Sequence, residues 1–154
     1  MRDLRPFAFV RLGCLVLLRW YLRAAFWVFA LSFFAQAFAP QETAAASVWG
    51  FAPGWQREIG FFDLAMALIA FFAIRTGDLR FQRSLTLAIV VLTTLVGTNH
   101  LVTILSGKTS SLHEVFAVVN YAAVAIGSAA LFSRQGRCHN GPPRMPSQGT
   151  KTRP

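Results

Sequence analysis

The chain has 154 residues, enough for a single domain, and 55% of them are hydrophobic while only 14% are charged. Soluble domains carry about 25% charged residues, so this composition excludes an ordinary soluble fold. The net charge is +9, but the Lys and Arg residues lie at the ends of apolar runs, as in membrane proteins, and not in a patch that would bind nucleic acid. We therefore expect the lipid bilayer as a partner and no nucleic acid.

The first apolar run follows a basic N-terminal segment. Residues 1–19 are rich in Arg and are expected to form a cytoplasmic lead. Arg19 and Arg23 lie one helical turn apart and can extend toward the interface beside Trp20. Residues 20–39 are then left to cross the membrane, which is about the length that a hydrocarbon core requires.

A cleaved signal peptide is an alternative interpretation of the same segment. The basic start, the apolar run and Ala37-Phe38-Ala39 fit the pattern loosely. However, Pro40 would directly follow the cut, and the basic lead is long and contains apolar blocks. A retained helix is therefore favoured.

The rest of the chain alternates between polar connections and apolar runs. Residues 40–57 are expected to form a loop, because Pro, Gly and Thr punctuate them, and their Trp and Phe residues place this loop at the membrane interface. Three further apolar runs predict helices over residues 58–74, 84–105 and 112–132. Residues 133–154 are rich in Pro, Gly and Arg without hydrophobic periodicity, and are expected to form a disordered, basic, cytoplasmic tail.

The distribution of Lys and Arg predicts the orientation. The two ends of the chain and the 75–83 turn are rich in Arg, whereas the 40–57 loop and the 106–111 turn hold one cation each. Because Lys and Arg accumulate on the cytoplasmic side, both termini are expected there, with an even number of crossings. The predicted fold is an all-α, integral membrane four-helix bundle over residues 20–132, in a bacterial inner (plasma) membrane.

Motifs for catalysis, redox chemistry or metal binding are not recognisable. Cys14 and Cys138 lie near opposite ends of the chain, no Ser or Cys sits in a nucleophile elbow, and no nucleotide-binding or haem-attachment motif is present. His100, His113 and Glu58 lack the paired spacing of a zinc motif, so a metal site is disfavoured. We predict no catalytic or metal-binding residue, do not favour an enzyme, and leave the cofactor open.

Polar residues gather in the extracytoplasmic half of the predicted bundle. Ionisable groups at this depth are costly and usually face an interior or a water-filled cavity. We therefore expect a small polar pocket, whose candidate ligand-binding residues are Glu58, Asp63, Asn99, His100 and Asn120. The alternative is that these side chains only hydrogen-bond one another between helices.

Two of these residues, Glu58 and His100, are predicted at the extracytoplasmic ends of neighbouring helices. If the two side chains converge, each lowers the cost of burying the other, and they should behave as a unit. His113 and Glu114 open the fourth helix and are expected to be ordinary solvated positions at a helix end.

Two segments carry a resemblance to a known family. Residues 55–65 read Trp-Gln-Arg-Glu-Ile-Gly-Phe-Phe-Asp-Leu-Ala, which resembles the Arg-Glu-Leu-Gly-Phe-Ala-Asn-Leu signature of a family of small four-helix bacterial membrane proteins of unknown function. Gly97-Thr98-Asn99-His100 is similar to the Gly-x-x-His of that family near the end of its third helix. The region 40–49 resembles its Pro-x-x-Thr-Ala loop through Thr43 and Ala44.

The likeness covers roughly residues 20–132 and implies the fold and topology of that family, but no activity. It gives weight to Glu58 and His100, which match the two signatures. Asp63 departs from the pattern, since the family usually has Asn at that position.

Three functions are compatible with these features, and the sequence alone does not separate them. The favoured one is a binding or accessory membrane protein that uses the polar pocket. A proton-coupled small-molecule exporter would use Glu58 or Asp63 as its coupling carboxylate, and would work as a homodimer because four short helices are few for a pathway. A membrane oxidoreductase partner that acts through a quinone is the third.

Overall fold

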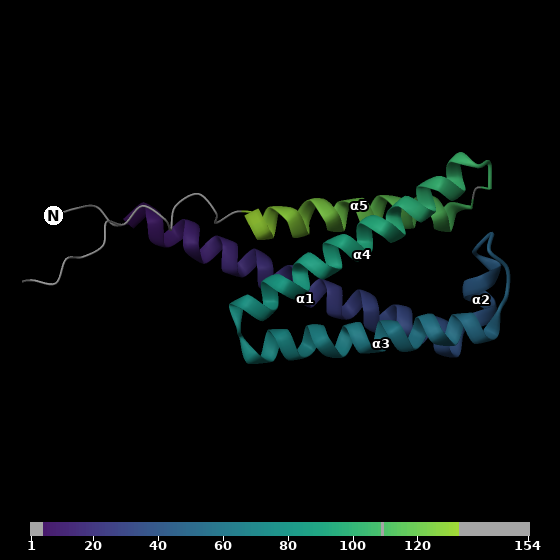
Figure 1. Ribbon diagram of the computed structural model, residues 1–154, viewed down its shortest axis with the longest axis horizontal. Helices are drawn as coiled ribbons and strands as arrows, with labels where there is room; N and C mark the ends of the chain where they lie inside the picture. Colours follow the sequence, from purple (N-terminus) through teal and green to yellow (C-terminus); the bar gives the residue numbers. More distant parts are fainter. Residues whose placement is uncertain (1–4, 109, 133–154) are drawn as a thin grey trace, which may run out of the picture.

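A computed structural model of the protein describes residues 5–108 and 110–132, with side chains from residue 16 onward. The described chain is α-helical and contains no strand. Its five helices, shown in Figure 1, are α1 (Arg5–Phe38), α2 (Pro40–Ala45), α3 (Pro53–Thr76), α4 (Leu79–Leu105) and α5 (Ser111–Phe132).

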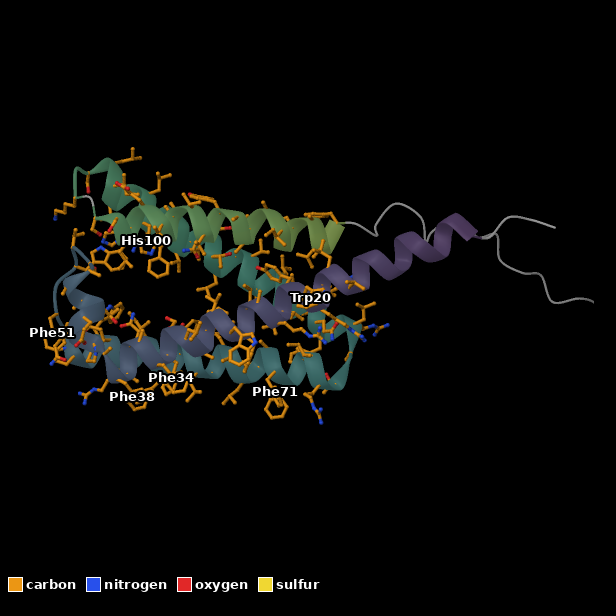
Figure 2. All side chains as sticks on the ribbon, turned by 180° about the vertical axis from the view of Figure 1, so that it is seen from behind. Trp20, Phe34, Phe38, Phe51, Phe71 and His100 are labelled. Carbon is orange, nitrogen blue, oxygen red and sulfur yellow. The ribbon has the colours of Figure 1, made fainter. Side chains whose placement is uncertain are left out.

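Four of these helices are long and apolar enough to cross a membrane, over Val16–Phe38, Pro53–Thr76, Leu79–Leu105 and Ser111–Phe132. Their outward faces carry many large apolar side chains, and Figure 2 shows Phe34, Phe38 and Phe71 pointing away from the bundle. A contiguous apolar surface of this extent is not stable in water, whereas lipid tails cover it without cost. The protein is an integral membrane protein, as the sequence predicts.

The helices associate as two antiparallel pairs. α1 packs along α3, α4 packs along α5, and the two pairs cross with a smaller area of contact (Figure 1). The buried apolar core lies where the pairs meet and consists of Tyr21, Leu22, Ala25, Ala70, Ala73, Leu85 and Ile89. Several of these residues are small, which lets helix backbones approach closely where lipid offers no hydrophobic driving force.

A tight turn at the core end joins the two pairs. Gly77 ends α3 with a φ of 68°, a left-handed conformation that glycine adopts without strain. Asp78 then caps α4, because its carboxylate accepts hydrogen bonds from Arg80 N at 2.8 Å and Phe81 N at 3.4 Å. Gln82 Nε2 donates to Ala73 O at 2.9 Å and ties the two helices together below the turn.

α5 packs tightly against both α4 and α1 at Gly127. A Cβ at this position would lie 2.6 Å from Val90 Cγ2 and 2.8 Å from Tyr21 Cζ, which is closer than real Cβ contacts. Glycine therefore lets α5 reach α4 and α1 at the same point. The other end of the bundle is called here the α2 end. There the loop between α2 and α3 contacts the second helix pair.

The helix bounds differ from the predicted spans in an informative way. α1 begins at Arg5, within the predicted 1–19 lead, while α3 and α4 begin at Pro53 and Leu79, before the predicted 58 and 84. Pro at the first turn and an Asp cap explain the last two starts, because helices continue through polar residues beyond the hydrocarbon core. Part of the predicted 40–57 loop forms α2, which Pro40 opens. The predicted tail over 133–154 lies outside the described residues.

Candidate functional site

The most unusual polar contact in the bundle joins two histidines at the α2 end. His100 lies in the last turns of α4 and His113 in the first turn of α5, and their side chains are 6% and 0% exposed. The Nδ1 atoms of the two rings are 2.7 Å apart, which is hydrogen-bonding distance. The short turn between α4 and α5 brings the two residues to the same level.

Residues 46–52, the loop between α2 and α3, cover this pair. Val48 N donates a hydrogen bond to His113 Nε2 at 3.2 Å, and Ser110 Oγ donates to Ala46 O at 3.1 Å. Through these two bonds, the first helix pair is attached to the second at the α2 end. Figure 2 shows His100 at this end of the molecule, and Phe51 of the same loop beyond it.

The hydrogen bonds also assign the ring protons. Val48 N–H is a donor, so His113 Nε2 accepts, and the proton of neutral His113 lies on Nδ1. That Nδ1–H donates to His100 Nδ1, so the proton of neutral His100 lies on Nε2. The chain of hydrogen bonds thus ends at His100 Nε2–H, a donor for which no described residue provides an acceptor.

Aromatic rings surround the histidine pair. The Trp49 ring stacks on His100 with centroids 5.1 Å apart and approaches His113 at 4.6 Å. The Phe116 ring also stacks on His100, at 5.5 Å and an interplanar angle of 20°. These contacts fix the orientation of the His100 imidazole. The four residues Trp49, His100, His113 and Phe116 are called the histidine cluster below.

The arrangement can donate one hydrogen bond and can respond to protons. Each imidazole already uses its only acceptor nitrogen, so a proton can be added to the pair only when a hydrogen bond breaks. Within the described residues, no group of three or more His, Cys, Asp or Glu side chains is placed to hold a metal ion.

The structure distributes the five predicted ligand-binding residues over different environments. His100 belongs to the histidine cluster, while Asp63 is buried between α1 and α3 and accepts a hydrogen bond from Ser32 Oγ at 2.6 Å. Glu58 is exposed on α3 and makes no hydrogen bond or ion pair within the described residues. Its expected partner His100 is instead paired with His113.

The two asparagines are not joined to this group by hydrogen bonds. The Asn99 side chain is exposed, and its backbone oxygen accepts from Thr103 Oγ1 at 2.9 Å. Asn120 is half-buried, and its Nδ2 donates to Phe116 O at 2.7 Å within α5. A Cβ on Gly97 would lie 3.0 Å from Asn120 Cβ, so this pair marks a close contact of α4 with α5.

The expectation for His113 was wrong. The sequence placed it at a solvated helix end, whereas its side chain is fully buried. The cause is tertiary, because the loop over residues 46–52 folds onto the helix end and excludes water. A usable signal was present, since His100, His113 and Trp49 all belong to segments that the topology brings to one side of the membrane.

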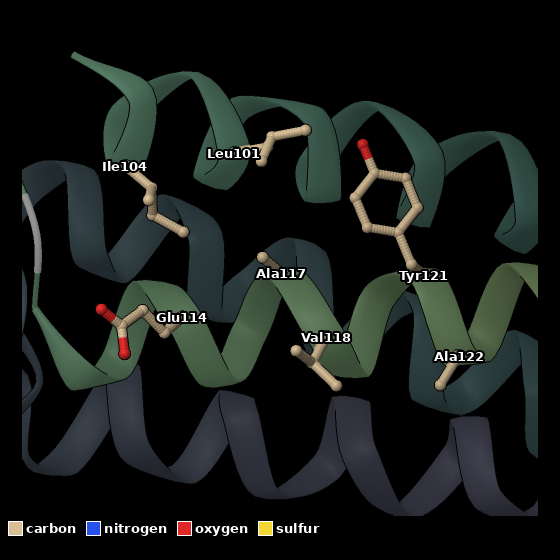
Figure 3. A pocket seen from close by; sticks show the side chains of 7 residues that line it. All are labelled: Leu101, Ile104, Glu114, Ala117, Val118, Tyr121 and Ala122. Carbon is tan, nitrogen blue, oxygen red and sulfur yellow. The ribbon is translucent and has the colours of Figure 1, made fainter.

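A shallow groove runs along the outer face of the α4–α5 pair (Figure 3). It is lined by Leu101, Ile104, Glu114, Ala117, Val118, Tyr121 and Ala122, so its walls are almost entirely apolar. The Tyr121 hydroxyl lies 3.3 Å from Thr98 Oγ1, within hydrogen-bonding distance. A groove with such walls suits a lipid chain, and it differs from the polar pocket that the sequence predicts.

Four apolar spans and a buried polar cluster at one end define a small α-helical integral membrane protein. The chain belongs to a family of unknown function (DUF6790), whose sequence profile matches residues 9–138. The match confirms the predicted membership of a family without an assigned activity. Searches of curated proteins and of solved structures found no significant match.

Proposed function

We propose that the protein is a membrane-embedded binding or accessory protein, whose ligand site is the histidine cluster on the extracytoplasmic side. The observation that supports this proposal is the free His100 Nε2–H, at the end of a hydrogen-bond chain that starts at Val48. A donor held in one orientation by stacked rings is prepared for an acceptor atom of a ligand. The placement on the extracytoplasmic side rests on the distribution of Lys and Arg.

The chemistry of the site favours a small molecule with a carbonyl or a similar acceptor beside a flat ring. The Trp49 and Phe116 rings provide stacking surfaces, and His100 provides the donor. A quinone head group has both features and is soluble in the membrane. Binding of a quinone, in support of a membrane oxidoreductase, is therefore the second candidate function.

A pair of substitutions at His100 separates ligand binding from folding. In His100→Asn the amide oxygen replaces the Nδ1 acceptor for His113 but the Nε2–H donor is lost. In His100→Gln the amide nitrogen approximates the Nε2–H donor. We expect native mass spectrometry of the wild type in detergent to show a bound small molecule, which His100→Asn loses while its secondary structure is retained.

A short-chain benzoquinone serves as a defined probe of the same site. Binding beside Trp49 should quench its fluorescence, and the quenching should be weaker in His100→Asn and absent in Trp49→Phe. The proposal fails if the wild type carries no bound molecule and shows no saturable quenching. It also fails if His100→Asn matches the wild type in both measurements.

A further inference from the structure

Asp63 is the only acidic residue in the middle of a membrane span within the described chain. It lies near the centre of α3, which runs from Pro53 to Thr76, and its side chain is only 7% exposed. A helix of this length crosses the whole hydrocarbon core, so the carboxyl group sits far from both interfaces. Ionisable residues at this depth are costly to keep and usually have a function.

The partners of Asp63 do not compensate a negative charge. Its Oδ2 accepts a hydrogen bond from the Ser32 hydroxyl at 2.6 Å, and Ser32 is neutral. No described residue forms an ion pair with it. The charged or titratable side chains with described surroundings on the helices that contact α3 are Arg19, Tyr21 and Arg23 of α1, Glu42 of α2, and Arg80, Arg83 and His100 of α4.

A buried polar atom about one helical turn from the Ser32–Asp63 bond lacks a partner. Gln36 lies one helical turn after Ser32 on α1, and its Oε1 is buried without a hydrogen bond. Gly60, which precedes Asp63 by about one turn, faces it, because a Cβ on Gly60 would lie 3.3 Å from Gln36 Cβ. Ser32, Gln36, Gly60 and Asp63 thus line one contact between α1 and α3, called here the α1–α3 seam.

We propose that Asp63 is a proton-binding site in the membrane interior, separate from the histidine cluster. A carboxylate that takes a proton from hydronium becomes neutral and releases one water. The neutral form removes the buried charge and adds an O–H donor to a seam that contains an unpaired acceptor. Metal cations such as Mg²⁺ and Ca²⁺ require about six or more oxygen ligands, whereas the side chains of the seam offer oxygens from only three residues.

This site goes beyond the proposed ligand site, because the two share no residue and can be tested separately. Proton binding at Asp63 would supply the coupling step that a proton-linked membrane protein needs. The property to be tested is whether this carboxyl group carries a proton that it loses as the pH rises, which a permanently charged Asp would not show.

Dicyclohexylcarbodiimide tests this state, because this apolar reagent enters membranes and adds to protonated carboxyl groups. We expect intact-mass measurement of the purified full chain to show one adduct, mapped to Asp63 by peptide sequencing. The labelling rate should fall as the pH rises. Glu58→Gln should label like the wild type, since Glu58 is exposed, and Asp63→Asn should not label.

The Ser32→Ala variant should change the pH dependence of labelling at Asp63, which a purely structural role of Asp63 would not predict. The Ser32 hydroxyl donates to the charged carboxylate, so its removal should extend labelling to higher pH than in the wild type. The labelling should be the same in sodium chloride and in choline chloride.

Three outcomes would overturn the proposal, and each is read on the wild-type protein even if Asp63→Asn does not fold. The first is an unmodified Asp63 at every pH, and the second is a labelling rate that does not depend on pH. The third is protection by sodium at constant pH, which would assign the seam to a metal cation.

Discussion

The imidazole of His113 is hydrogen-bonded on both sides, with Val48 N 3.2 Å from its Nε2 and His100 Nδ1 2.7 Å from its Nδ1. One side chain therefore joins the loop over residues 46–52, α4 and α5. The apolar core cluster lies toward the other end of the bundle. At the α2 end, the two helix pairs are joined by this contact and by the hydrogen bond from Ser110 to Ala46.

Removal of His113 should weaken the link. His113→Phe leaves both the Val48 N–H and the His100 Nδ1 without a partner. Membrane hydrogen bonds are each worth about 0.6 kcal/mol and at most about 2, so we expect a loss of about 1–3 kcal/mol in the free energy of unfolding. His113→Gln keeps one donor and one acceptor and should lose less. Unfolding by SDS, followed by circular dichroism, measures both, and equal losses would contradict the assigned bonds.

Acidification should release the loop over residues 46–52. The two hydrogen bonds coexist only while the pair carries no added proton, so acid breaks one of them and should loosen the docked loop. The neighbouring charged side chains Glu42, Lys108 and Glu114 are exposed. Trp49 emission, with Trp49→Phe as the blank, should change when the pH is lowered from about 8 to about 4. An unchanged Trp49 signal over this range would mean that the loop does not depend on the histidines.

Substitution of Gly127 should be more damaging than substitution of an open glycine. A methyl group at Gly127 collides with Val90 and Tyr21, and overpacking of this kind costs about 1–3 kcal/mol. A Cβ on Gly54, in the first turn of α3, would meet no neighbouring group within 4 Å, so Gly54→Ala should be neutral or slightly stabilising. Thermal unfolding in detergent compares the two variants, and a similar effect of both would argue against the close approach of α5.

Glu58 provides a test of the site expected from the sequence. Its side chain is exposed and without a polar partner among the described residues, so Glu58→Gln should change the free energy of unfolding by less than about 0.5 kcal/mol. Binding of the benzoquinone probe should also be retained if the histidine cluster alone holds the ligand. If a folded Glu58→Gln protein no longer binds the benzoquinone probe, Glu58 belongs to the ligand site.

Reporter fusions test the orientation. Fusions after Ser47 and Thr109 should report the extracytoplasmic side, and fusions after Gly77 and Gln135 the cytoplasmic side, as the distribution of Lys and Arg predicts. An extracytoplasmic signal at Gly77 would invert the bundle and place the histidine cluster on the cytoplasmic side.

The number of spans, their approximate positions and the membership of the family are properties of the sequence itself. They follow from local information, because an apolar run as long as the bilayer is thick can satisfy its backbone in lipid only as a helix. Apolar runs do not indicate the extensions of α3 and α4 to Pro53 and Leu79, because an apolar run ends at the interface while a helix continues to its cap.

The composition of the site was decided by tertiary structure. The sequence predicts one pocket that contains both Asp63 and His100, yet the two helix pairs separate Asp63, which meets Ser32, from His100, which meets His113. In lipid no hydrophobic force selects which helix faces meet, so small residues such as Gly60 and Gly127 set the pairing through close packing. Only that packing, with the loop over residues 46–52 folded onto it, turns His113 from a helix-end residue into the centre of a buried cluster.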